Sequence, residues 1–137
     1  MTTSYPLTEP DLRAWFDRYT GTFQALVRGE RSDPEAMTEF FCLPLTMVGD
    51  QQVTVLDRAG FLATWGAMYE QLAAVDYHHS TVERFEVTAY NGRALAIDAA
   101  GRRHTNAGTV LEDWSATYLV VGTDEGPRIL ALLSPPG

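Results

Sequence analysis

Asp98 is the residue of this sequence that most strongly suggests chemistry. The pair Asn91-Gly92 predicts a two-residue hairpin loop, which would place Phe85 opposite Asp98 on neighbouring strands. The carboxyl group would then point into an apolar interior, where its ionised form is costly unless a donor reaches it. A carboxyl held in such a pocket can act as a general acid or base. The competing interpretation is a β-bulge that turns Asp98 toward solvent.

Tyr19 is a second candidate, because it lies on the apolar stripe of a predicted helix. Its hydroxyl could donate a hydrogen bond to a carbonyl oxygen and so stabilise developing negative charge. The alternative is a core tyrosine whose hydroxyl is satisfied within the protein.

His79 is the third candidate for a catalytic residue. The same hairpin register sets it beside His104, with Glu83 two positions along the same face. Two imidazoles and a carboxylate could share a proton or bind a metal ion. Because this spacing is not diagnostic, we favour a polar rim to a pocket and predict neither a metal nor a cofactor.

Composition narrows the classes of partner. The chain has 137 residues, 45% of them hydrophobic, and a net charge of -8. We assign residues 1–137 to one domain, with 1–7 and 134–137 as tails. An acidic chain lacks the basic face that nucleic acids and anionic membranes require. Cys42 is the only cysteine, and neither a signal-peptide pattern nor a membrane-length apolar stretch occurs, so we expect a cytoplasmic protein.

Helical spacing dominates the N-terminal half. Thr8 and Asp57 are capping residues that precede apolar stripes of helical period, and a short helix must end before Pro44. The predicted order is helix, short helix, two strands and helix, over residues 8–29, 32–43, 45–48, 53–56 and 57–75.

The period changes to two from residue 77 onward, which predicts strands over residues 77–90, 93–105, 109–121 and 128–133. The predicted inward face holds small side chains at Ala94, Ala96, Ala100 and Ala116. These cannot fill the gap beneath a helix, so either bulky helix residues fill it or a cavity remains. The residues expected to line such a cavity and bind a ligand are Trp15, Phe41, Trp65, Met68, Tyr69, Phe85, Trp114 and Tyr118.

This order of elements predicts an α+β fold in which a curved antiparallel sheet wraps around three helices and forms a cone with an internal pocket. The pattern resembles the NTF2-like superfamily, of the SnoaL-like or ketosteroid-isomerase-like kind. The stretch from Trp15 to Tyr19 resembles the first helix of ketosteroid isomerases, and residues 33–41, 57–75 and 128–130 are similar to the superfamily at large.

The resemblance implies a homodimer formed through the outer face of the sheet, and it gives Tyr19 the role of oxyanion donor. The isomerase base would fall near Asp50, in a predicted turn, and the second donor near Ser115 or Ala116, where no acid stands. These departures argue against a steroid isomerase.

Three functions follow from this sequence. The first is a cofactor-independent isomerase, cyclase or hydrolase for a small apolar substrate, with Asp98 or His79 moving a proton and Tyr19 stabilising an oxyanion. The second is a non-catalytic domain that binds a small apolar or aromatic molecule. The third is an assembly module that acts through its outer sheet face.

Overall fold

The computed structural model describes residues 8–135, and the predicted order of elements is confirmed. The predicted N-terminal tail, residues 1–7, lies outside the described residues, as do 136–137 at the other end. The elements are α1 (Glu9–Val27), the 3-10 helix η1 (Pro34–Phe40), β1 (Phe41–Val48), β2 (Val53–Leu56), α2 (Arg58–Ala74), β3 (Tyr77–Ala89), β4 (Ala94–Thr105), β5 (Val110–Thr123) and β6 (Gly126–Leu133).

Both long helices begin where the capping residues predict. The Thr8 hydroxyl accepts a hydrogen bond from the Asp11 amide at 3.2 Å, and the Asp57 carboxylate accepts one from the Gly60 amide at 2.8 Å. The apolar face of α1 is buried along its whole length, at Leu12, Trp15, Phe16, Tyr19, Phe23, Leu26 and Val27. None of the helices within residues 8–135 is both long and apolar enough to cross a bilayer.

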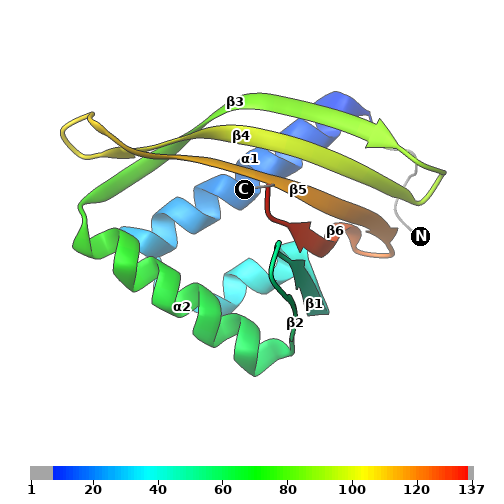
Figure 1. Cartoon of the computed structure of the whole chain (residues 1–137), viewed down its shortest axis with the longest axis horizontal. Coiled ribbons are helices and arrows are strands. Elements are labelled where there is room, and N and C mark those ends of the chain that lie inside the picture. The colour runs from blue at the N-terminus through cyan, green and yellow to red at the C-terminus, as the bar shows by residue number, and fades with distance from the viewer. Residues whose placement is uncertain (1–7, 136–137) are drawn as a thin grey trace.

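The strands form one open, curved sheet in the order β2-β1-β6-β5-β4-β3. Figure 1 shows the long strands β3, β4 and β5 arching over α1 and α2. The α+β fold is therefore confirmed, with one correction. The sheet is mixed rather than wholly antiparallel, because β1 pairs in parallel with β6.

The loop between β3 and β4 differs from the predicted two-residue turn. The amides of Tyr90 and Asn91 both donate to the Ala94 carbonyl, at 3.0 and 3.3 Å. The Asn91 side-chain oxygen accepts from the amides of Arg93 and Ala94, at 2.8 and 2.9 Å. This wider loop shifts the register by one residue, so Glu86 rather than Phe85 pairs with Asp98.

Two irregularities in the ladders set which faces look inward. The β3–β4 register shifts between Val82 and Arg84, and beyond that point His79 pairs with His104 as predicted. In the β4–β5 ladder Asp98 pairs with Thr117, and the register shifts between Arg103 and His104. A one-residue shift moves every side chain to the other face of a sheet.

As a result, β4 presents the opposite face to the one predicted. Its buried inward side chains are Leu95, Ile97 and Ala99, and Ile97 pairs with Tyr118. Of the four alanines expected to face inward, Ala94, Ala96 and Ala100 lie on the outer face of β4, and only Ala116 on β5 faces the helices.

Gly101 lies where the backbone of β3 leaves no room for a side chain on β4. A Cβ atom added there would lie 1.7 Å from the Thr81 carbonyl oxygen and 3.0 Å from the Trp114 indole nitrogen. The Trp114 Nε1–H donates to that same carbonyl at 3.2 Å. The absent side chain therefore lets an indole from β5 hydrogen-bond to β3 across the intervening strand.

Gly101→Ala should therefore lower the free energy of unfolding by about 3 kcal/mol, because the new methyl group meets backbone that cannot move aside cheaply. Gly66→Ala is the matched control, since a Cβ at that α2 position has nothing within 4 Å. The control should raise stability by about 0.5–1 kcal/mol through helix propensity. Urea unfolding of the three proteins measures both effects, and equal stability of the two variants would contradict this account.

Candidate functional site

A cavity of about 160 Å³ lies between the helices and the inner face of the sheet. Every layer of the fold contributes to its wall. The lining residues come from α1 (Tyr19, Thr20, Phe23), β1 (Met47), α2 (Trp65, Met68), β3 (Ser80), β4 (Arg103), β5 (Trp114, Ser115, Ala116, Tyr118) and β6 (Leu132).

Tyr19 stands at the centre of the aromatic packing around this cavity. Its ring lies 5.3 Å from Phe16, 5.7 Å from Phe40, 5.8 Å from Phe41 and 5.9 Å from Tyr118, centroid to centroid. All four contacts are tilted or edge-on, the arrangements that aromatic quadrupoles favour. The wall on this side is thus held by interlocked rings.

The Tyr19 and Tyr118 hydroxyls remain protonated across the physiological range. Burial raises the pKa of Tyr19 well above its usual value, and the neighbouring Tyr118 raises it further. Burial also raises the pKa of Tyr118 to about 12, although a hydrogen bond with Tyr19 and the charge of Arg103 both act to lower it. Both groups therefore present neutral O–H groups to the cavity.

Trp65 forms the α2 side of the wall. Its ring stacks on Phe61 at 4.4 Å, with 23° between the planes, and contacts Phe41 edge-on at 5.4 Å. The Trp65 indole nitrogen is buried and has no hydrogen-bond partner among residues 8–135. A buried donor without a partner costs about 1–3 kcal/mol, so this N–H group favours a ligand with an acceptor.

Arg103 brings a positive charge to the same cavity. Its Nη1 atom pairs with the Glu112 carboxylate, and the side chains of Arg103 and Glu112 are 24% and 50% exposed. The Arg103 Nε atom is buried and unpartnered within the described part of the chain. Arg103 pairs with Glu112 on β5 and shares its face of β4 with Gly101 and Ala99.

Five of the residues predicted for a site line the cavity: Tyr19, Trp65, Met68, Trp114 and Tyr118. The other four predicted ligand-binding residues, Trp15, Phe41, Tyr69 and Phe85, do not line it and pack into or against the hydrophobic core. Phe85, for example, contacts Phe16 at 5.3 Å and lies beneath the Arg13 guanidinium.

Asp98 does not point into the cavity, so the predicted inward orientation is wrong. It pairs with Glu86 and Thr117 on the face opposite Tyr118, and its carboxylate accepts a hydrogen bond from the Thr117 hydroxyl. The wider Asn91 loop is the cause, because it shifts β4 by one residue relative to β3.

His79 is also outside the cavity. It pairs with His104 as predicted, and the two rings stack at 4.6 Å with 10° between them. The cavity face at this level carries Ser80 and Arg103 instead, because the β3 irregularity at residues 82–84 turns His79 outward. Burial and the nearby His104 lower the pKa of His79. No group of three metal-ligating side chains is present in residues 8–135.

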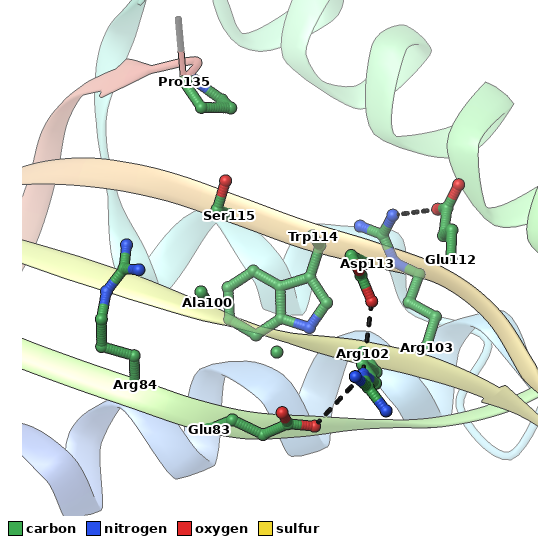
Figure 2. Close-up of a pocket in the computed structure, with 11 residues that line it drawn as sticks. Glu83, Arg84, Ala100, Arg102, Arg103, Glu112, Asp113, Trp114, Ser115 and Pro135 are labelled. Atoms are coloured by element: carbon green, nitrogen blue, oxygen red, sulfur yellow. Dashed lines mark hydrogen bonds and ion pairs between the residues drawn. The ribbon is translucent and has the colours of Figure 1, made fainter.

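A wider hollow of about 730 Å³ lies at the outer surface of β3, β4 and β5 and is shown in Figure 2. Its charges are already paired. Arg102 lies 3.3 Å from Asp113 and 3.9 Å from Glu83, and all three side chains are more than half exposed. This hollow therefore selects no particular ligand charge, and the inner cavity, with its more apolar wall, is the better candidate site.

Comparison with known proteins places the chain in a family. The family model described as NTF2-like protein (DUF6841) matches residues 9–137. The chain belongs to this NTF2-like family. No curated protein matches it.

Solved structures share the fold of this NTF2-like chain at low sequence identity. An NTF2-like protein with a cystatin-like fold from Novosphingobium aromaticivorans is 16% identical, with a TM-score of 0.68 over 89% of this chain and 77% of that one. A protein of unknown function with a cystatin-like fold from Nostoc punctiforme is 11% identical, with a TM-score of 0.69 over 93% and 92%. A ketosteroid isomerase-like protein from Erwinia carotovora atroseptica is 13% identical, with a TM-score of 0.62 over 88% and 89%.

The positions that the isomerase resemblance singled out can now be placed in this NTF2-like fold. Asp50 lies in the turn between β1 and β2 and does not line the cavity. Ser115 and Ala116 do line it, and neither is an acid. The cavity thus differs from the acid-containing site that the resemblance implies for steroid isomerases.

Sequence reasoning missed Arg103, which lines the cavity. The residue follows Arg102 in the chain, and only the register of β4 decides which of the two arginines points inward. Phe23 and Leu132 also line the cavity, and nothing in the spacing of apolar residues separates a cavity wall from ordinary core.

The raised tyrosine pKa values predict alkaline sensitivity. The free energy of unfolding should be at its full value below about pH 10, where the tyrosines are protonated in both the folded and the unfolded protein. It should fall as the pH rises toward about 12, because the tyrosines of the unfolded state ionise first. Tyr118→Phe should reduce that loss by about 3 kcal/mol. The measurement is urea unfolding across this range.

Tyr90→Phe is the control for this experiment, because Tyr90 is exposed. It should leave the pH dependence unchanged, and an identical alkaline loss in wild type and Tyr118→Phe would show that Tyr118 is not the group responsible.

Proposed function

We propose that this NTF2-like chain is a binding protein for a small, single-ring molecule, which it holds in the inner cavity without chemical conversion. One observation carries the proposal. Among the cavity-lining residues of the described chain there is no aspartate, glutamate, histidine or cysteine. Hydroxyl groups do line the cavity, but a serine, threonine or tyrosine hydroxyl is a weak nucleophile or base unless an adjacent base activates it, and none of these lining residues supplies that base.

The size of the cavity supports a ligand of about one ring. Drug-sized ligands occupy pockets of about 300–1,000 Å³, whereas a dry cavity of about 150 Å³ accommodates benzene. The present cavity is about 160 Å³ and is walled largely by aromatic rings and methionines. A flat, polarisable ring matches this wall better than a steroid-sized skeleton does.

The polar groups in the wall favour a ligand with a hydrogen-bond acceptor. The Tyr19 and Tyr118 hydroxyls stay protonated, and the Trp65 indole N–H group lacks a partner within residues 8–135. The same hydroxyls could polarise a substrate carbonyl, as the catalytic hypothesis requires. That hypothesis also needs a base, and the positions of Asp98 and His79 do not support either residue in that role.

Filling the cavity should abolish binding while preserving the fold. Ala116 lies in the wall between Trp114 and Tyr118, so Ala116→Phe places a ring where the ligand's ring would sit. Calorimetric titration with benzamide, a neutral ring with an acceptor, should show binding to the wild type and an affinity at least about ten-fold weaker for the variant.

Ala89→Phe is the matched control, because Ala89 is exposed at the end of β3 and does not line the cavity. It should bind benzamide as the wild type does. Equal affinity in Ala116→Phe and wild type would place binding elsewhere, and no binding of any ring compound by the wild type would contradict the proposal.

We also propose that the chain forms a homodimer through the outer face of the sheet and works in the cytoplasm; its grouping with SnoaL-like proteins stays a prediction. The centre of that outer face supports the dimer, since the row Ala96, Leu119 and Ala131 joins three adjacent strands without a charge. The cytoplasmic location rests on Cys42 being the only cysteine.

Leu119→Arg should convert the dimer into monomers, because it places a charge in the middle of the apolar row. Thr64→Arg makes the same charge change on the exposed side of α2 and should leave the dimer intact. Sedimentation velocity of the three proteins decides the point, and a monomeric wild type would exclude the dimer.

A further inference from the structure

We propose that the ligand is a monoanion, a single-ring carboxylate whose carboxylate group is bound by Arg103 at the mouth of the inner cavity. This inference rests on the proposed function, that the cavity holds a small ring compound, and adds the charge and orientation of that compound.

The wall of the inner cavity carries a positive charge. Arg103 is the only formally charged residue that lines the cavity in residues 8–135. Its neighbours are tyrosine, tryptophan, methionine and small side chains, which offer neutral donors but no carboxylate facing it from the wall. A fixed positive charge beside an apolar hollow attracts an anion and disfavours a cation.

The guanidinium group of Arg103 is only partly engaged in hydrogen bonds. One of its ends is already engaged, because Nη1 pairs with Glu112 on the neighbouring strand. That contact holds the planar group in one orientation. Its Nε–H group is buried and makes no hydrogen bond within the described part of the chain. Arginine binds carboxylates through two parallel N–H donors, and the Nε–H group is a donor that still lacks a partner.

Arg103 lies between the inner cavity and the solvent-exposed outer surface of the sheet. Arg103, Trp114 and Ser115 line both the inner cavity and the outer hollow, so they form the boundary between the two. Figure 2 shows Arg103 on β4 reaching across to Glu112 on β5 at this boundary. β5 has no partner on its other side here, because β6 pairs only with Thr117–Thr123.

These positions orient the ligand. A carboxylate at Arg103 stays near water and retains part of its hydration, which limits its desolvation cost. The ring then extends inward between Trp65 and Tyr118, where a single ring fits the available volume of about 160 Å³. The alternative is that Arg103 is purely structural, with Glu112 as its only functional partner.

Calorimetric titration with benzoate and benzamide separates these alternatives, since the two probes have similar size and differ in charge. The wild type should bind benzoate at least about ten-fold more tightly than benzamide, as a charge-assisted pair exceeds a neutral hydrogen bond. Arg103→Gln should remove that preference, so that its affinities for benzoate and benzamide differ by less than about two-fold. Arg103→Lys should retain part of the preference, because it keeps the charge and loses the planar donor pair.

Glu112→Gln provides a second test that does not remove the arginine. Its side-chain oxygen can still accept from Arg103, while the competing negative charge is gone, so benzoate affinity should rise about three-fold or more and benzamide affinity should not change. A purely structural arginine predicts no such rise.

The outcomes distinguish the two proposals. Equal binding of benzoate and benzamide by the wild type, both lost in Ala116→Phe, would overturn the anionic ligand and leave the ring-binding function in place. Binding of neither probe would overturn both. Circular dichroism of each variant confirms that the fold is kept, and if Arg103→Gln does not fold, Glu112→Gln still decides the inference.

Discussion

The hydrogen-bond register of β4 between its two neighbours is the constraint on which the site depends. The Asn91 side chain accepts from two successive backbone amides and makes the β3–β4 loop wider than a two-residue turn. That loop pairs Glu86 with Asp98 and, through the next ladder, Ile97 with Tyr118. Because side chains alternate strictly between the faces, this choice places Arg103 rather than Arg102 at the cavity.

Irregularities in the strand pairing change which side chains of the long strands face the cavity. The register shift in β3 at residues 82–84 and the shift in β5 beyond Arg103 both lie near the end of the sheet that borders the cavity. Such bulges bend strands and redirect side chains, and they occur often beside functional sites. Here the β3 shift turns His79 to the outer face, opposite His104, while Ser80 and Arg103 face the cavity.

The cavity exists because rigid aromatic packing surrounds positions with little or no side chain. Tyr19, Phe41 and Trp65 interlock through tilted and edge-on contacts that hold one wall in place. Opposite them the sheet offers Ser80, Ser115 and Ala116, whose short side chains do not fill the gap. A small hollow with aromatic walls and fixed donors follows, and its one charged group, Arg103, lies at the boundary with solvent.

The sequence by itself determined where the helices and strands of this protein lie. Capping residues and apolar patterns of helical or alternating period depend on only a few neighbouring residues. Thr8 and Asp57 start the helices where their chemistry requires, and the inward faces of α1 and β5 follow from periodicity alone. Tyr19, Trp65 and Tyr118, which were predicted as site residues, therefore line the cavity. Tertiary structure alone decided which side chains of β4 point toward the helices. Its face depends on one loop and two bulges, where shifts of a single residue differ little in local energy and are selected by packing across the whole sheet. For that reason Asp98 was predicted inside and lies outside, and Arg103, which was not predicted as a site residue, lines the cavity.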